Sequence, residues 1–400
     1  MLSVAEATRR ILDRARFLGT EEVSLAGARG RVLAASVRAE RPLPPWDNSA
    51  MDGFAVRAAD LAAGPVELPV AGEMVCGSRP GAELPAGAAF RIMTGAPMPA
   101  GADAVVMREE VDDRGASARF AGPVPPGEHV RRAGEDVAAG SLVLGPGTGL
   151  GPGEIGMLAA LGRAVATVGR RPRVAILCTG DELCPVGGEP APGQIFSSNE
   201  HALAAQVAEA GGEVARAELV PDDRARTSAA VAAALDCDVV VTSGGVSVGD
   251  RDHVRQALDA AGVAIDFWKV AMRPGKPVVF GTAATGALFF GLPGNPASSL
   301  VSFELFVRPA LLALQGAVDV ARPRTEVVLA GPAHKSPGRA HYLRAVLHRR
   351  GERLEAELHA KQGSGMLSSL VGFDALVELA AELGDLPAGA RCPALLLRPA

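Results

Sequence analysis

The chain has 400 residues, 48% of them hydrophobic, which is enough to build the cores of two to four domains of ~100–200 residues each. This composition excludes disorder as the main state of the chain. Forty basic and forty-five acidic residues leave a net charge of −5, so there is no overall basic field to hold nucleic acid or an anionic membrane. A local basic pocket remains compatible with this balance.

The cysteines are odd in number, scattered and without a C-x-x-C pair, which argues against a disulfide framework or a thiolate metal site. They are Cys76, Cys178, Cys184, Cys237 and Cys392. The N-terminal segment alternates apolar and charged residues at helical spacing, and no continuous apolar run reaches the ~18 residues of a membrane span. We therefore expect a protein of the reducing cytoplasm that is neither exported nor bound to a membrane.

The first 171 residues divide into three stretches. Residues 1–41 begin with an amphipathic helix and end where the Pro-rich segment RPLPPWDNSAMDGFAV starts. Residues 45–140 are rich in Gly and Pro and carry short β-like runs without a long helical pattern, which predicts a small β domain. Residues 141–171 predict one helix and one strand that rejoin the first stretch. We therefore expect a discontinuous domain of residues 1–44 and 141–171, interrupted by a β-rich subdomain of residues 45–140.

The remaining residues predict two further domains. Between 172 and 318, apolar runs of strand length such as RVAILC and DVVVT alternate with helical patterns, which is typical of a doubly wound sheet of parallel strands with helices on both faces. Residues 319–400 lose the helical period and show short strands separated by turns, which predicts a small β barrel or sandwich. The fold class is therefore a multidomain α/β protein.

Three loops of the predicted sheet carry distinctive residues directly after a strand. They cover residues 179–182 (TGDE), 243–250 (SGGVSVGD) and 292–298 (LPGNPAS). Ligands of doubly wound sheets sit beyond the carboxyl ends of the strands, so these loops should converge on one edge.

The SGGVSVGD loop resembles a phosphate cradle. Glycines allow backbone amides to point inward and serines add hydroxyl donors; the residues are Ser243, Gly244, Gly245, Ser247 and Gly249. The loop is neither G-x-x-x-x-G-K-[ST] nor G-x-G-x-x-G, so it indicates no P-loop or Rossmann dinucleotide site. The alternative interpretation is a flexible strand-to-helix turn.

Acidic residues gather at the same predicted edge. Carboxylates beside a phosphate cradle repel a phosphate unless a cation lies between them, which implies Mg²⁺. The candidates are Asp181, Glu182, Asp222, Asp223, Asp250 and Asp252. Each could instead cap a helix or lie in a surface turn, a role that Asp250 could fill for the following helix and that we favour for Asp223.

A cationic segment, WKVAMRPGKP, contains Lys269, Arg273 and Lys276, and its prolines, including Pro277, restrict the backbone. Only four of the forty basic residues are lysines, and two of them fall in this segment. Ser298 is expected in the first turn of a helix, where free amides attract an anion. Together these residues suit a small oxyanion, although solvated charge and a simple helix cap remain the alternatives.

Further polar residues lie outside this domain. Asp52 follows Ser49-Ala50-Met51 on a Gly53 turn, Thr94 ends a strand, and the segment RRAGEDV supplies Arg131, Arg132 and Asp136. Turn chemistry alone explains most of these positions. No Ser-His-Asp order, H-E-x-x-H motif or paired Cys/His set supports a protease, hydrolase or zinc site.

Seven motifs together resemble the molybdopterin molybdenumtransferases, the MoeA type that also forms the E domain of gephyrin. They are PPWDNSAMDGFAV, RIMTGAPMP, RRAGEDV, TGDEL, TSGGVSVGDRD, MRPGKP and GLPGNPASS, and they occur in order along essentially the whole chain. The resemblance implies that residues 172–318 form a molybdopterin-binding α/β domain, that residues 45–140 form an elongated subdomain and that the C-terminal part is a barrel. It also implies a homodimer whose active sites combine both subunits.

The implied reaction inserts molybdenum from molybdate into adenylylated molybdopterin and releases AMP. The resemblance assigns Glu182, Asp222 and Asp252 to Mg²⁺ and the hydrolysed linkage, and residues 243–250 with Asp181 to the pterin and phosphates. It assigns the molybdate pocket to Arg273, Lys276, Pro277, Ser298, Arg344 and Ser364. The partner subunit would supply Asp52, Thr94, Arg131 and Asp136. A contact with the adenylyltransferase of the preceding step is a further expectation.

Two residues depart from the family's pattern. Arg273 stands where many members have Lys, which keeps the charge but changes its shape. Cys178 stands where Ser is frequent, which puts a hydroxyl contact in doubt. Two other functions stay open, a molybdopterin adenylyltransferase and a non-catalytic molybdopterin-binding scaffold. The adenylyltransferase needs neither the SAMDG segment nor a C-terminal barrel, and a pure scaffold has no use for Asp252 or Lys276.

Overall fold

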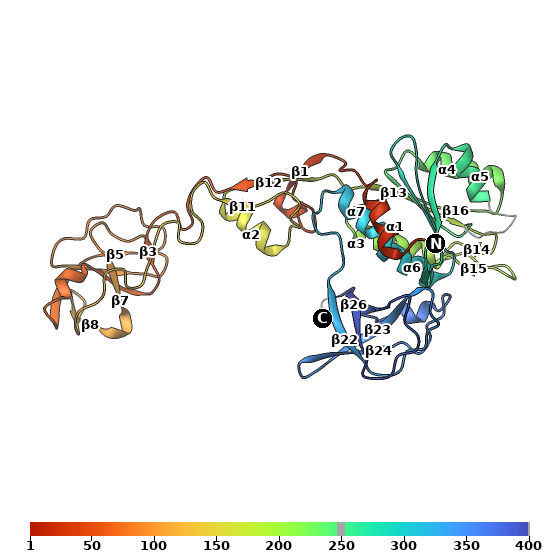
Figure 1. Ribbon diagram of the computed structural model, residues 1–400. Coiled ribbons are helices and arrows are strands. Elements are labelled where there is room, and N and C mark those ends of the chain that lie inside the picture. Colours follow the sequence, from red (N-terminus) through yellow and green to blue (C-terminus); the bar gives the residue numbers. More distant parts are fainter. Residues whose placement is uncertain (246–252, 399–400) are drawn as a thin grey trace. The chain divides into compact units, whose positions relative to one another are not determined.

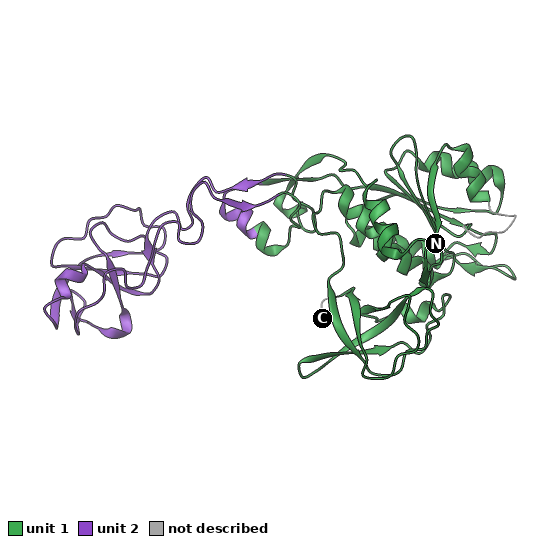
Figure 2. Ribbon diagram, viewed as in Figure 1, with its two compact units in different colours: residues 1–34, 146–155, 165–400 green, residues 35–145, 156–164 purple. Residues whose placement is uncertain are grey.

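The computed structural model describes residues 1–245 and 253–398. The predicted site residues Ser247, Gly249, Asp250 and Asp252 lie outside the described residues. The chain forms two compact units, of which the first contains residues 1–34, 146–155 and 165–400 and the second residues 35–145 and 156–164 (Figure 2). The predicted division into four domains is not decided by these units and stays a prediction.

A six-stranded sheet organises the first unit. Its strands lie in the order β16 (Glu213–Val220), β13 (Arg173–Thr179), β17 (Val239–Ser243), β21 (Leu288–Leu292), β20 (Pro277–Thr282) and β18 (Ala264–Lys269). The first four are parallel, as the alternation of strand and helix predicts. β20 is antiparallel to β21, and β18 is antiparallel to β20. The short connections at this edge leave no room for the crossover helix that a parallel pair requires.

Helices cover both faces of this sheet (Figure 1). α1 (Val4–Leu12), α3 (Ser198–Glu209) and the helix formed by α6 (Pro296–Ser302), η4 (Phe303–Val307) and α7 (Arg308–Leu314) contribute to one buried cluster. α4 (Arg224–Ala234) and α5 (His253–Ala260) contribute to a second. Along β13, Ile176 belongs to the first cluster and Leu177 to the second, because successive strand residues point to opposite faces. The doubly wound arrangement is confirmed.

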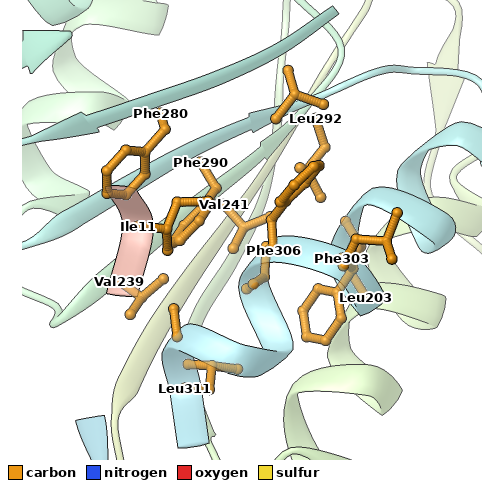
Figure 3. Packing of buried hydrophobic residues seen from close by; sticks show 14 of the residues in the cluster. Ile11, Leu203, Val239, Val241, Phe280, Phe290, Leu292, Phe303, Phe306 and Leu311 are labelled. Atoms are coloured by element: carbon orange, nitrogen blue, oxygen red, sulfur yellow. The ribbon is translucent and has the colours of Figure 1, made fainter. Parts of the chain in front are cut away.

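Among the described residues, one helix, Pro296–Leu314, is long and apolar enough to cross a membrane by length and composition. Within its apolar window 78% is buried inside the protein. Figure 3 shows Phe303, Phe306 and Leu311 of this helix packing in the core that also contains Phe280 and Phe290 of the sheet. The helix therefore serves as a core element of the α/β domain.

The C-terminal residues form a closed barrel of β22 (Arg324–Leu329), β23 (Ala340–Arg350), β24 (Arg353–Leu358), β25 (Ala375–Leu379) and β26 (Arg391–Leu396). Pairing of β25 with both β23 and β26 closes the ring. The predicted barrel is therefore confirmed, and the alternative prediction of a sandwich is wrong. A short strand, β19 (Met272–Arg273), joins β23 in parallel and sets Arg273 opposite His341. The cationic segment of the α/β domain is thereby held against the barrel.

Two smaller pairings complete the first unit. β1 (Thr20–Ser24) is antiparallel to β12 (Val165–Gly169), so two segments far apart in the sequence meet. The helix α2 (Pro152–Ala160) precedes β12, as the sequence predicts. β14 (Leu183–Cys184) pairs with β15 (Ile195–Phe196) next to the end of β13.

The second unit is built around a sheet in the order β7 (Ala104–Met107), β4 (Gly53–Val56), β6 (Ala89–Ile92), β5 (Val66–Met74), β9 (Ser117–Phe120) and β8 (Val111–Asp113). Phe54 and Phe120 pack edge to face in its core with ring centroids 5.9 Å apart. β3 (Asn48–Ser49) pairs with β10 (Val130–Arg131), and β2 (Val37–Arg38) pairs with β11 (Leu142–Leu144). The expected β-rich architecture is confirmed.

Candidate active site

A pocket of about 690 Å³ lies at the carboxyl ends of β13, β17 and β21. We call it the cradle pocket. The three predicted loops converge on it as far as they are described, which confirms the expectation from the parallel strands. Its lining includes Cys178, Thr179, Gly180, Glu182, Asn199, Asp222, Ser243, Gly244, Gly245, Pro277, Pro293, Gly294 and Asn295.

Close packing between loops requires a glycine at position 244 of the cradle. Gly244 has a φ of +94°, and a Cβ there would lie 2.6 Å from the carbonyl oxygen of Thr179. A Cβ on Gly294 would approach the Cα of Gly244 at 3.6 Å. Side chains at Gly244 would therefore push apart two of the strand ends that form the pocket. This close contact favours a built cradle over a loose turn.

Asn199, in the first turn of α3, connects two of these loops and was not predicted. Its side-chain Nδ2 donates to Ser243 Oγ at 2.8 Å and to the Gly294 carbonyl oxygen at 2.7 Å. Its Oδ1 is buried without a hydrogen-bond partner in the described part of the chain. In the sequence, an Asn at a helix start resembles an ordinary cap, which hides this role.

The predicted acidic residues divide into two groups. Glu182 and Asp222 line the cradle pocket, and neither carboxylate is ion-paired within the described residues. Asp181 does not line it, because its Oδ1 accepts a hydrogen bond from the backbone N–H of Asp222 at 3.0 Å. Asp223 caps α4 by accepting from Arg226 N–H at 2.8 Å, which confirms the alternative favoured for it.

Glu182 and Asp222 suit a hard divalent cation by their chemistry, since carboxylate oxygens are the ligands that Mg²⁺ prefers. No group of three or more His, Cys, Asp or Glu side chains that could hold a metal occurs within residues 1–245 and 253–398. The third predicted ligand, Asp252, lies outside these ranges. The described residues therefore supply two ligands of the predicted set.

Cys178 lies at the end of β13 and lines the cradle pocket. Burial, with a smaller effect of the nearby Glu200 carboxylate, raises the pKa of its thiol to about 12. The side chain is therefore a neutral thiol at physiological pH and offers the pocket only a weak donor in place of the hydroxyl that a Ser would supply.

A second pocket, of about 250 Å³, adjoins the first and shares Pro277, Pro293 and Asn295 with it. We call it the cationic pocket. Its lining contains no acidic side chain and consists of Met272, Arg273, Pro274, Gly275, Lys276, Pro277, Pro293, Asn295, Ser298, Arg339, Gln362 and Ser364. The structure thus brings together five of the six residues predicted for molybdate, whereas Lys269 is not part of the lining.

Arg344, the sixth predicted molybdate residue, is fully buried and faces the loop that carries Ser364. Its Nε donates to Ser369 Oγ at 3.1 Å, and its Nη2 donates to the carbonyl oxygens of Lys361 and Gly363 at 3.3 and 3.1 Å. Burial lowers the pKa of this guanidinium to about 10. Arg344 therefore shapes the loop, and Ser364 in turn accepts from Asn295 Nδ2 at 3.1 Å.

The second unit brings Asp52 and Thr94 together. Asp52 Oδ1 accepts from the backbone N–H and the hydroxyl of Thr94 at 2.7 and 2.8 Å. The backbone hydrogen bond of Thr94, followed by that of its hydroxyl, lowers the pKa of the Asp52 carboxyl. Asp52 lines a hollow of about 220 Å³. Arg131 and Asp136 are exposed and do not line this hollow.

The fold and the two pockets define an α/β protein with a glycine-rich pocket beside a cationic one at the strand ends of a doubly wound sheet. Three family descriptions match the chain. "MoeA N-terminal region (domain I and II)" covers residues 2–162, "Probable molybdopterin binding domain" covers 175–313, and "MoeA C-terminal region (domain IV)" covers 326–397. The chain belongs to the MoeA family, whose curated members are named molybdopterin molybdenumtransferases.

Relatives match over nearly their whole length. Molybdopterin molybdenumtransferase 2 of Mycobacterium tuberculosis is 39% identical over 97% of this chain and 98% of that protein. The molybdopterin molybdenumtransferase of Haemophilus influenzae is 37% identical over 97% of each chain. The crystal structure of the molybdopterin biosynthesis MoeA protein of Pyrococcus horikoshii has a TM-score of 0.86 and 30% identity, covering 99% of this chain and 100% of that one. The resemblance inferred from the seven motifs is confirmed.

Proposed function

We propose that this protein inserts molybdenum from molybdate into adenylylated molybdopterin in a Mg²⁺-dependent reaction that releases AMP. The observation that carries the proposal is the pair of adjoining pockets, one lined by carboxylates and glycine loops and the other by cations without a carboxylate. Membership of the family supports the chemistry, because its curated members bear the name molybdopterin molybdenumtransferase.

The cradle pocket suits the phosphate linkage of the adenylylated pterin. Backbone amides of the glycine loops and the Ser243 hydroxyl can donate to phosphate oxygens. Glu182 and Asp222, together with Asp252 outside the described residues, would hold Mg²⁺, which supplies positive charge against the phosphate oxygens when bound. Asn199 keeps Ser243 and Gly294 at a fixed spacing around the ligand.

The cationic pocket suits molybdate, a tetrahedral dianion. Arg273 and Lys276 supply positive charge, and the hydroxyls of Ser298 and Ser364 supply neutral donors. Because the two pockets share three lining residues, an oxyanion in the cationic pocket would lie next to the end of the ligand in the cradle pocket. Such proximity is a large part of the catalysis of a reaction between two bound substrates.

We further propose a homodimer in the cytoplasm, in which Asp52, Thr94, Arg131 and Asp136 of the partner subunit complete each site. This part of the proposal rests on the family resemblance. Its local support is the Asp52 carboxylate, which is exposed, oriented by two hydrogen bonds from Thr94 and kept ionised by its lowered pKa. The substrate could be handed over by the preceding adenylyltransferase through direct contact.

The decisive experiment incubates purified protein with adenylylated molybdopterin, molybdate and Mg²⁺ and measures AMP release and pterin-bound molybdenum. We expect both products to form together. Asp222→Asn should slow AMP release by about 100-fold or more, the loss typical of removing one group that stabilises transition-state charge. Asp223→Asn is the matched control, because Asn keeps the helix cap of α4 and Asp223 does not line the pocket.

The alternatives predict other results in the same experiment. ATP consumption with free molybdopterin would favour an adenylyltransferase. Tight pterin binding without AMP release in any condition would favour a non-catalytic scaffold. Equal turnover of Asp222→Asn and wild type would contradict the assigned metal site.

A further inference from the structure

Glu304 is the one acidic residue that is buried among the residues that the structure describes, with 8% of its surface exposed. Its Oε2 accepts from Arg322 Nε at 3.0 Å, and its Oε1 accepts from Gln206 Nε2 at 2.8 Å. A carboxylate is rarely buried unless it is paired, and desolvation of such a pair offsets much of what its attraction contributes to stability. Stability alone therefore does not account for an ion pair at this position.

Arg322, the partner of Glu304, lies in the segment between α7 and β22 and is 13% exposed. Its Nη2 donates to Glu209 Oε1 of α3 at 2.8 Å, and its Nη1 donates to the carbonyl oxygen of Leu397 at 3.3 Å. Leu397 directly follows β26, and its N–H donates to the carbonyl oxygen of Asp374 beside β25 at 2.8 Å. One guanidinium thus joins two helices of the α/β domain to the barrel.

Glu304 stands in η4, which is a π-helical turn between α6 and α7. Such a turn is rare and adds one residue to the helix, which changes the direction of later side chains by about 100°, because an α-helix has 3.6 residues per turn. Ser298 precedes the turn and lines the cationic pocket, whereas Arg308 follows it and donates to the carbonyl oxygen of Val320 at 3.0 Å. The helix therefore faces the pocket at its start and the interdomain segment after the turn.

The barrel contacts the same helix a second time, at the cationic pocket. The N–H of Ala297 donates to the carbonyl oxygen of Ser364 at 2.9 Å, and Asn295 Nδ2 donates to Ser364 Oγ at 3.1 Å. From Ser298 to Glu304 the helix rises by about 9 Å, at 1.5 Å per residue. Two separate contacts with one helix fix the orientation of the barrel, whereas a single contact would leave it free to pivot.

We propose that Glu304 and Arg322 are positioning residues for the cationic pocket. Their ion pair fixes the barrel against the helix, so that Ser364 stays beside Ser298 in the pocket wall. Neither Glu304 nor Arg322 lines this pocket, so the pair acts through the helix and the barrel. The inference deepens the proposed function and rests on it for the identity of the oxyanion.

The test measures equilibrium binding of molybdate to the full-length protein, together with amide hydrogen exchange in residues 361–366. Arg322→Gln breaks the ion pair. It should weaken molybdate binding by about two- to thirtyfold, the range of coupling carried by packed networks, and it should speed exchange in this segment. Arg170→Gln is the matched control and should change neither, because it breaks an ion pair of the same unit whose bonds reach Asp238 and Arg171 and not the barrel.

A double replacement separates position from stability. Glu304→Met combined with Arg322→Met removes both charges, and such apolar replacement of a buried ion pair is often neutral, so the stability lost in Arg322→Gln should return. Molybdate affinity should stay low, because the hydrogen bonds that orient the barrel are still missing. Recovery of affinity together with stability would overturn the inference, as would unchanged affinity and exchange in Arg322→Gln.

Kinetics add a further readout. In both the single and the double variant the KM for molybdate should rise, while AMP release at saturating molybdate stays within a few fold of wild type, a split that general misfolding would not produce. If wild type binds no molybdate, but exchange in residues 361–366 responds to Arg322→Gln and not to Arg170→Gln, the proposed function fails while the positioning role stands.

Discussion

The cradle pocket and the cationic pocket are neighbours with opposite linings. Within the part of the chain that the structure describes, the first presents two carboxylates without an ion pair and glycine loops, and the second presents three cations without an ion pair and no carboxylate. The residues that they share, Pro277, Pro293 and Asn295, carry no charge. The comparison shows how, under the proposed function, one protein edge would separate two anions, holding one through a metal and backbone amides and the other through side-chain cations directly.

The largest effect should come from Gly244→Ala in the cradle pocket. The new Cβ would meet the Thr179 carbonyl oxygen at 2.6 Å, so two strand ends must shift, and we expect AMP release to fall by about 100-fold or more because misplacing catalytic groups is costly. Gly286→Ala is the control. It introduces a comparable strain of ~1–2 kcal/mol at positive φ, but its Cβ meets open space. Equal loss of activity in both variants would show that backbone strain, and not the contact with Thr179, causes the loss.

Lys276→Ala tests the cationic pocket. We expect the KM for molybdate to rise by about ten- to a hundredfold, the size of a lost charged hydrogen bond, with little change in affinity for the adenylylated pterin. Lys269→Ala removes the same charge from the same segment, but Lys269 lines neither pocket, so it should leave both constants unchanged. Steady-state kinetics with each substrate varied in turn would separate the two outcomes.

Asn199→Ala should produce a smaller effect confined to the cradle pocket. It removes two hydrogen bonds, to Ser243 and Gly294, each worth ~0.5–1.5 kcal/mol, so the KM for the adenylylated pterin should rise by about tenfold. Affinity for molybdate should not change. Gln206→Ala on the same helix serves as control, because its amide bonds to Leu300 and Glu304. A matching loss of molybdate affinity would mean that the pockets are not independent.

The smallest effect concerns stability rather than catalysis. Burial, followed by the charges of nearby cationic side chains, lowers the pKa of His341 to about 4 in the folded protein, from near 6.5 in the unfolded chain. Between pH 4 and pH 6.5 the unfolded chain therefore binds more protons than the folded protein. Stability should therefore fall as the pH drops through this window, by at most ~1.4 kcal/mol per pH unit. His341→Gln should flatten that decline in urea unfolding at pH 7 and pH 5. His201→Gln, at an exposed position in α3, should leave it unchanged.

Much of the site could be predicted because it follows from periodicity. Alternating strands and helices imply parallel strands, and parallel strands carry the loops of Thr179, Ser243 and Gly294 to one edge. The antiparallel β20 was missed because an apolar run does not encode its direction. The cap at Asp223 was expected because its position before a helical pattern is a local signal.

Residues whose roles depend on distant contacts could not be found in this way. Asn199 resembles a helix cap in the sequence and reveals its bonds to Ser243 and Gly294 only in the fold. Arg339 is one of many arginines, and the pairing of β19 with β23 is what places it in the cationic pocket. Arg344 was predicted to line the cationic pocket, but it does not, because it is buried and donates to the loop that carries Ser364.

The most direct test of the account compares Glu182→Gln and Lys276→Ala by calorimetric titration with two ligands, AMP in the presence of Mg²⁺ and molybdate. We predict a crossed pattern, in which Glu182→Gln loses affinity only for the nucleotide and Lys276→Ala only for the oxyanion. If both variants lose both ligands equally, or if either loses the ligand assigned to the other pocket, then the two pockets do not hold separate substrates.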